Sequence, residues 1–194
     1  KAEEIQALTD FIYTKVTPAP VWGEAEIKAS QVVDMAALDL PNKPSPALKG
    51  ADPMNLFIVV ETGDHHVSVL DGDKLERIHR FPSRYALHGG PKYSPDGRFV
   101  YFASRDGWVT KYDLWNLKVV AETRAGLNTR NAAVSGDGKW VMVANYLPHT
   151  LVVLDAKDLS LTKIIPVVNA KGDKSSRVSA VYDAAPRKSF VAAL

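Results

Sequence analysis

After residue 55, hydrophobic and polar residues alternate in short runs that are separated by turn-forming residues. Short runs rich in Val, Ile, Phe and Tyr are typical of strands in an antiparallel sheet. The pattern therefore predicts an all-β region over residues 55–194. The strands expected from these runs are 56–60, 67–70, 88–93, 99–103, 109–112, 140–144, 151–154 and 178–182.

Two sequence markers recur at nearly the same interval. An Asp closes an apolar run at Asp71, Asp113 and Asp155, and both intervals are 42 residues. The run SPDGR at 94–98 recurs as SGDGK at 135–139, an interval of 41 residues between the Asp-Gly pairs. A repeat of about 40 residues with four strands is typical of a β-propeller blade and disfavours an irregular sandwich. About three blades fit here, whereas propellers have about four to eight, so we expect part of a longer propeller.

The segment before these strands has a different pattern. Three apolar residues recur with helical spacing and form one stripe: Ile5, Leu8 and Ile12. They predict a short helix within residues 1–14. Residues 15–54 are rich in proline, which favours extended backbone and predicts a linker that wraps around or spaces domains. Within this linker, Val21 and Trp22 are expected to dock on a neighbouring surface.

Strand order predicts which side chains share one end of the blades. The inner strand expected at 88–93 starts at that end, and an Asp-Gly turn follows it at the opposite end. We expect this turn to be a two-residue hairpin, because Asp and Gly tolerate positive φ. The strand 99–103 then returns to the starting end. Four candidate site residues fall at that end: His88, Arg105, Arg130 and Tyr146.

These four residues offer a consistent set of chemical groups. A neutral imidazole such as His88 binds metals, and the guanidinium groups of Arg105 and Arg130 bind carboxylates with two hydrogen bonds. Tyr146 offers an aromatic face and a hydroxyl. Together they suit an anionic, planar, metal-bearing cofactor. Alternatives from the residues alone are a structural hydrogen-bonding role for the histidine, solvated or blade-bridging arginines, and a packing role for the tyrosine. The sequence does not identify a catalytic residue.

Composition limits the remaining functions. The net charge of +2 over 194 residues is too small to predict binding to nucleic acid or to an anionic membrane. No apolar run is long enough to span a bilayer, and no signal-peptide pattern is visible. Cysteine is absent, so this chain itself has neither disulfides nor a Cys-x-x-Cys-His haem attachment. Phosphate-loop, Rossmann and HExxH motifs are also absent.

Several segments resemble the cytochrome cd1 nitrite reductase family. The runs that carry the resemblance are LFIVV at 56–60, VSVLDGD at 67–73, YALH at 85–88, YDLW at 112–115, and the segments 4–13 and 17–23 before them. In that family a cytochrome c domain precedes an eight-bladed propeller that holds haem d1. The stretches ETGDHH at 61–66 and NYLP at 145–148 resemble the dihydro-haem d1 dehydrogenases of haem d1 biosynthesis more than the nitrite reductases.

The resemblance implies a role for each candidate residue. His88 matches the proximal iron ligand of haem d1, and Arg105 and Arg130 match arginines that bind the carboxylates of the macrocycle. Tyr146 matches a tyrosine near the ring. The resemblance also implies that residues 1–14 are the last helix of a cytochrome c domain, whose haem c would lie upstream of this chain.

The implied activity is an oxidoreductase reaction. A propionate side chain of dihydro-haem d1 would be oxidised to an acrylate, and the electrons would pass to the upstream haem c. Implied partners are haem d1 or its precursor and a nitrite reductase that accepts haem d1, and the implied location is the periplasm. Thr62 and Pro91 stand where the nitrite reductase carries arginines, which implies easier product release. Nitrite reduction and a non-catalytic scaffold remain alternatives, and we expect the chain alone to be inactive.

Overall fold

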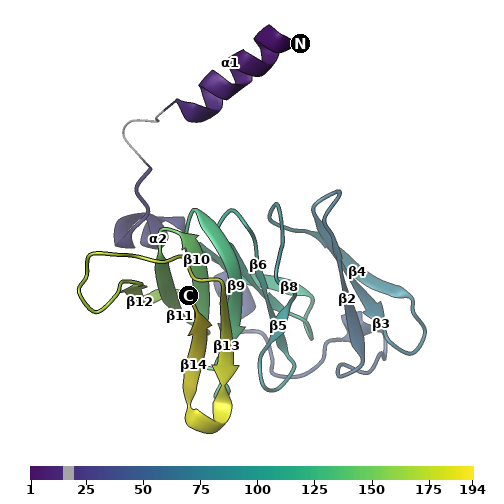
Figure 1. The fold of residues 1–194 in the computed structure, drawn as a ribbon. Coiled ribbons are helices and arrows are strands. Elements are labelled where there is room, and N and C mark those ends of the chain that lie inside the picture. The colour runs from purple at the N-terminus through teal and green to yellow at the C-terminus, as the bar shows by residue number, and fades with distance from the viewer. Residues whose placement is uncertain (15–19) are drawn as a thin grey trace.

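The computed structural model describes residues 1–14 and 20–194. Antiparallel sheets make up most of it, and short helices precede them (Figure 1). Each sheet corresponds to one sequence repeat, and strands that are neighbours in a repeat are neighbours in its sheet. The all-β propeller prediction is confirmed. We number the sheets as blades 1 to 4 in chain order.

The four blades differ in how many of their strands the described residues supply. Blade 1 contains β2 (Leu56–Glu61), β3 (His66–Asp71) and β4 (Arg77–Pro82). Blade 2 contains β5 (Lys92–Tyr93), β6 (Phe99–Ala103), β7 (Trp108–Asp113) and β8 (Lys118–Arg124). Blade 3 contains β9 (Asn128–Val134), β10 (Trp140–Leu147), β11 (Thr150–Asp155) and β12 (Leu161–Pro166). Blade 4 contains β13 (Ala180–Ala184) and β14 (Ser189–Ala193), joined by the short helix η2 (Ala185–Arg187).

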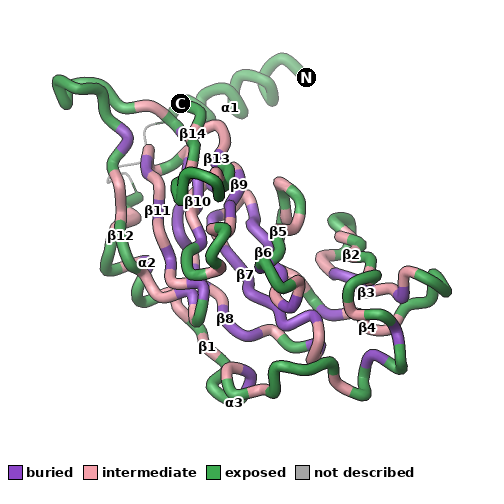
Figure 2. Tube along the Cα trace, turned by 90° about the horizontal axis from the view of Figure 1, so that it is seen from below, coloured by how far each residue is buried: buried purple, intermediate pink, exposed green. Residues whose placement is uncertain are grey.

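Neighbouring blades pack face to face through separate hydrophobic clusters. Between blades 1 and 2, the rings of Phe81 and Tyr112 stack with their centroids 4.1 Å apart. Between blades 2 and 3, Val109, Val141 and Val152 are each fully buried. Each such side chain stabilises the fold by about 1.5–3 kcal/mol when fully buried. Figure 2 shows that buried residues concentrate in the strands of blades 2 and 3, where both faces of a blade are covered.

The recurring Asp has a clear structural role. The carboxylate of Asp113 accepts hydrogen bonds from the amides of Trp115 and Asn116, both at 3.0 Å. Asp71 makes the same pair of bonds to the second and third residues after it. These bonds fix the turn between the third and fourth strands of a blade, as expected for Asp at the start of a turn.

The Asp-Gly connections are longer than the predicted two-residue hairpins. The amide of Ser94 donates to the carbonyl of Phe99 at 2.8 Å, and the amide of Gly97 donates to the carbonyl of Ser94 at 2.9 Å. Gly97 and Gly138 both have a φ of 71°, so each turn is followed by one left-handed residue. The dipeptide was correctly identified as a turn signal, but the turn that forms is a wider one of the kind that contains a left-handed glycine.

The strand expected at 88–93 is also shorter than predicted. Of the predicted strand, only the two residues of β5 pair with β6, because Gly-Gly-Pro at 89–91 interrupts the ladder. Both glycines have positive φ, and proline has no amide to donate. The amide of His88 still donates to the carbonyl of Ala103 at 2.8 Å. The histidine is therefore held beside β6 without being part of a strand.

The predicted linker is not extended throughout its described part, residues 20–54. It forms α2 (Glu24–Ser30), β1 (Val32–Val33), α3 (Met35–Leu38) and the short helix η1 (Pro46–Leu48). β1 pairs with β8 and adds a fifth strand to the outer edge of blade 2. Ile27 of α2 is only 1% exposed, so tertiary packing stabilises this short helix. The predicted linker residues 15–19 lie outside the described residues.

Trp22 docks on blade 2, as predicted for this residue. Its indole nitrogen donates to the carbonyl of Arg124 at 3.0 Å, and the Arg124 guanidinium lies 4.5 Å from the centre of the Trp22 ring. Val21 does not dock, because 74% of its surface is exposed. Of these two residues, only the tryptophan attaches the linker to the propeller.

Helix α1 (Ala2–Tyr13) forms where the sequence predicts a helix. None of its residues is buried, and Figure 1 shows it standing apart from the sheets. Its apolar stripe is exposed, with Ile5, Leu8, Phe11 and Ile12 each more than 60% accessible. The division of the chain into a cytochrome c helix, a linker and a propeller stays a prediction.

Candidate functional site

The two ends of the blades carry different connections. The loop 104–107, the end of β10 and the start of β9 lie at one end, which we call the near end. The Asp-Gly turns 94–98 and 135–139 lie at the opposite, far end. The four predicted site residues all belong to near-end segments, because strand order places them there.

His88 and Arg130 are in direct contact at the near end. Nη1 of Arg130 lies 2.8 Å from Nδ1 of His88 and 3.3 Å from Nε2. A guanidinium can only donate, so a ring nitrogen of His88 is the acceptor in this contact. An imidazole nitrogen of this kind is also a common metal ligand.

The backbone of Arg105, in the loop 104–107, bonds to the segments that carry His88 and Arg130. Its amide donates to the carbonyl of Ala86 at 2.9 Å, and its carbonyl accepts from the amide of Thr129 at 3.1 Å. The Arg105 backbone therefore lies between the segment of His88 and the segment of Arg130. The structure thus gathers three predicted residues at one place, and their roles toward a cofactor stay predictions.

Tyr146, the fourth predicted residue, sits in an irregularity of β10. Its two neighbours pair with β9 at Thr129 and Asn128, so the tyrosine has no partner of its own. Such bulges redirect a side chain out of the regular alternation of a strand. The guanidinium carbon of Arg105 lies 5.5 Å from the centre of the Tyr146 ring.

Two residues of this region were not found from the sequence. The guanidinium carbon of Arg177 lies 5.0 Å from the centre of the Tyr146 ring. The only available signal was its place after the polar insertion 169–176, in the connection to the next blade. Asn145 is fully buried beneath the site and bonds to three residues: Ala125, Thr129 and Thr150. No sequence signal distinguished this asparagine from a loop residue.

The arginines near this end differ in whether a carboxylate pairs with them. Within residues 1–14 and 20–194, Arg105, Arg130 and Arg177 form no ion pair with a carboxylate. Three arginines of blades 1 and 2 are each paired: Arg80 with Glu61, Arg84 with Glu122, and Arg98 with Asp113. The guanidinium groups of Arg105, Arg130 and Arg177 are therefore available to carboxylates of a ligand.

A cavity of about 290 Å³ opens beside His88, between blades 1 and 2. Thr62 and Pro91, the two departures from the nitrite reductase pattern, both line it. Gly89 and Gly90 line it too, and their lack of side chains leaves space next to the imidazole. An imidazole beside open space, with nearby guanidinium groups that have no carboxylate partner in the described residues, fits the anionic, iron-bearing macrocycle implied by the sequence.

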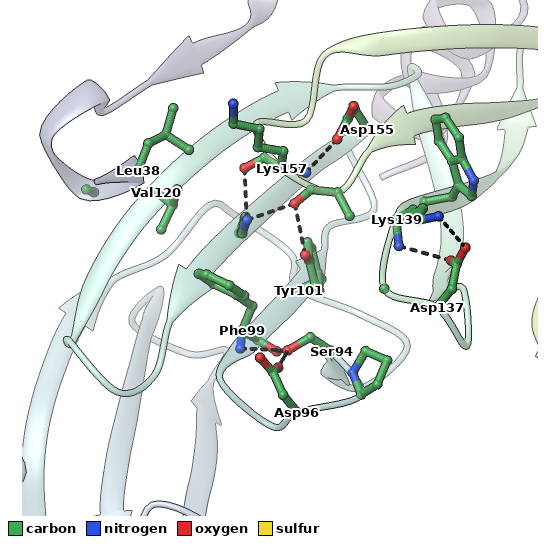
Figure 3. A pocket seen from close by; sticks show the side chains of 16 residues that line it. Leu38, Ser94, Asp96, Phe99, Tyr101, Val120, Asp137, Lys139, Asp155 and Lys157 are labelled. Atoms are coloured by element: carbon green, nitrogen blue, oxygen red, sulfur yellow. Dashed lines mark hydrogen bonds and ion pairs between the residues drawn. The ribbon is translucent and has the colours of Figure 1, made fainter. Parts of the chain in front are cut away.

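A larger cavity lies at the far end, between blades 2 and 3 (Figure 3). It measures about 580 Å³, and none of the four predicted residues lines it. Lys111 lines it and donates from Nζ to the carbonyls of Ala156 and Lys157, both at 2.8 Å. Burial, assisted by the nearby charge of Arg98, lowers the pKa of Lys111 to about 8. This lysine joins two blades and is remote from the near-end site.

Two further properties of the described residues bear on function. No group of three or more His, Asp or Glu side chains is placed to share a metal ion there. A single histidine suits a metal whose other ligands come from a macrocycle. No helix in the described part of the chain is long and apolar enough to cross a membrane.

The fold and the near-end residues define a class: β-propellers whose cationic end suits a planar, anionic, metal-bearing ligand. Comparison with known families makes this more specific. The sequence model of the Cytochrome D1 heme domain matches residues 51–194, and the chain belongs to this family. The resemblance to the cytochrome cd1 family is thereby confirmed.

Individual relatives agree with this assignment. The chain is 64% identical to the dihydro-heme d1 dehydrogenase of Pseudomonas aeruginosa over 188 residues, which are 97% of this chain and 37% of that protein. A solved structure of dihydro-heme d1 dehydrogenase NirN in complex with DHE matches 100% of this chain and 41% of its own, with 62% identity and a TM-score of 0.90. The nitrite reductase of Stutzerimonas stutzeri is 28% identical over 72% of this chain and 25% of its own length. The chain thus spans about two fifths or less of these relatives.

Proposed function

We propose that the complete protein binds haem d1 or its dihydro precursor at the near end and oxidises a propionate side chain to an acrylate. The observation that carries the proposal is the contact of His88 with Arg130 at the end of the blades that also carries Arg105 and Arg177, three arginines without a carboxylate partner in the described residues. The identity of 64% to a dihydro-heme d1 dehydrogenase, against 28% to a nitrite reductase, supports this activity over nitrite reduction.

The near-end residues would share the work of holding the ligand. His88 would bind the iron through a ring nitrogen, and the macrocycle would supply the redox chemistry when bound. Arg105 and Arg130 would each bind a carboxylate, since charge-assisted bonds of this kind are short and strong. Tyr146 would contact the ring system with its aromatic face.

Binding requires a rearrangement of one contact. With one ring nitrogen of His88 on iron, the other would carry a proton and act as a donor. Arg130 is also only a donor, so its contact with the imidazole would have to open whichever nitrogen held the metal. The released guanidinium is then free to bind a carboxylate of the ligand.

The reaction needs parts outside this chain. Conversion of propionate to acrylate removes one pair of electrons and one pair of protons from a saturated carbon–carbon bond. The electrons would pass to a haem c in the upstream domain predicted from residues 1–14, so the chain alone would be inactive. The family resemblance supports a periplasmic location and delivery of the product to a nitrite reductase.

Absorption titration of the full-length protein with dihydro-haem d1 tests the proposal. His88→Ala is expected to lose the spectral change of iron ligation and to bind the ligand at least about tenfold more weakly, because the iron ligand is removed. His149→Ala is the matched control, since this near-end histidine bonds Ser175 and no arginine. Identical spectra for the parent and His88→Ala would favour a non-catalytic scaffold. Production of nitric oxide from nitrite would instead favour the nitrite reductase alternative.

A further inference from the structure

We propose that Arg177 is an additional recognition residue, which binds a peripheral carboxylate of the tetrapyrrole beside the Tyr146 ring that Arg105 also contacts. The inference rests on the proposed function for the identity of its ligand. It extends the site from blades 2 and 3 to the connection that leads into blade 4.

The Arg177 side chain is exposed, but the backbone that carries it is fixed on both sides. The amide of Ser176 donates to the carbonyl of Val167, and the amide of Val178 donates to the carbonyl of Asn145, both at 3.1 Å. Val178 is fully buried against blade 3. The guanidinium is therefore presented to the near end from a defined position.

Two like charges share one aromatic ring in this arrangement. The guanidinium carbons of Arg105 and Arg177 lie 5.5 Å and 5.0 Å from the centre of the Tyr146 ring. Each contact with the ring is favourable, and neither guanidinium is paired with a carboxylate in the described residues. Each can therefore donate charge-assisted hydrogen bonds to a carboxylate that lies beside the ring.

The position of this cluster also suits a ligand with several carboxylates. Arg130 lies beside His88, whereas the cluster of Arg105, Tyr146 and Arg177 lies around the bulge of β10. A macrocycle held by its iron at His88 would present carboxylates at different points of its edge. Separate cationic contacts would then fix its rotation about the iron–histidine bond, which decides which side chain faces the reacting position.

The test uses titration of full-length Arg177→Gln and Arg177→Lys with dihydro-haem d1. Arg187→Gln is the matched control, because this arginine of blade 4 lies in η2 at the far end. We expect Arg177→Gln to bind about tenfold more weakly, Arg177→Lys to recover most of the affinity, and the control to bind as the parent does. With the ligand's carboxylates esterified, the parent and Arg177→Gln should bind equally, and added inorganic phosphate should not compete for the parent.

The outcomes separate this inference from the proposed function. If Arg177→Gln binds as tightly as Arg187→Gln while His88→Ala loses iron ligation, the Arg177 inference is wrong and the proposed function stands. An equal loss of affinity for the free and the esterified ligand would show a structural role and overturn the inference as well. If His88→Ala also binds normally, the proposed function itself fails. Competition by phosphate would identify a general anion site instead of a carboxylate contact.

Discussion

Replacement of Asn145 by Ala would test how the near-end site is held in place. This asparagine lies next to Tyr146 in β10 and pairs across the sheet with Thr129, which precedes Arg130 in β9. Its side-chain amide donates to the carbonyl of Ala125 at 2.9 Å. The substitution therefore removes a polar group that ties two site-bearing strands together.

The expected loss of stability follows from the buried network. Asn145 is fully buried, and besides the bond to Ala125 it donates to the hydroxyl of Thr150 at 3.1 Å and accepts from that of Thr129 at 2.7 Å. Alanine would leave these three groups without the partner they have now. Each unsatisfied buried group costs about 1–3 kcal/mol, and partial repairing among them is expected, so the total should be on the order of 3–5 kcal/mol.

Urea unfolding of the full-length protein, followed by tryptophan fluorescence, would measure this loss. Asn128→Ala is the matched control, because Asn128 lies in the same sheet and its side-chain oxygen has no hydrogen-bond partner among the described residues. The control should lose less than about 1 kcal/mol. Hydrogen exchange should also show faster opening of the β9 amides in Asn145→Ala.

Two results would refute this reasoning. Asn145→Ala could unfold within about 1 kcal/mol of the parent, which would mean that the network contributes little. Alternatively, Asn128→Ala could be as unstable as Asn145→Ala, which would show that any change in this sheet is damaging. In either case the asparagine could not be regarded as the residue that holds the near-end strands together.

Two other measurements address the blades themselves. Gly107→Ala should lower stability by more than about 3 kcal/mol in thermal unfolding, because its Cβ would lie 1.8 Å from the carbonyl oxygen of Gly126 at a φ of 99°. Gly63→Ala, with no atom within 4 Å of its new Cβ, should have little effect, and equal losses would contradict the prediction. Because burial lowers the pKa of Lys111 from its ordinary 10.5 to about 8, the folded state releases this proton first as pH rises. The stability of the parent relative to Lys111→Met should therefore rise between about pH 8 and pH 10.5 and stay flat below pH 8, and a fall in that window would refute it.

The blades could be predicted from the sequence because their markers act locally. Asp113 bonds to amides two and three residues after it, and Gly97 provides the left-handed residue of its own turn. Because these interactions are short-range, the residues that make them recur with the blade repeat and can be recognised in the sequence. The short helix α2 has no such recurring pattern, because the burial of Ile27 against distant strands stabilises it. The proline content of the linker therefore suggested extended backbone where tertiary packing forms a helix.

The site shows the same difference between local and distant causes. Strand order alone placed His88 and Arg130 at one end of the blades, and the structure brings them into contact. Arg177 could not be found in this way, because its position depends on a hydrogen bond between its neighbour Val178 and blade 3. Asn145 was missed because its role appears only when three separate segments meet around it.

The docking of Trp22 on blade 2 sets a covalent limit on whatever packs against α1. The indole is anchored to the Arg124 carbonyl, and only nine residue steps separate it from the end of α1 at Tyr13. A chain of that length cannot reach beyond about 30 Å even when fully stretched. The end of the helix must stay within that radius of the outer edge of blade 2. An electron carrier packed on α1 would therefore be confined to one sector of the propeller's rim.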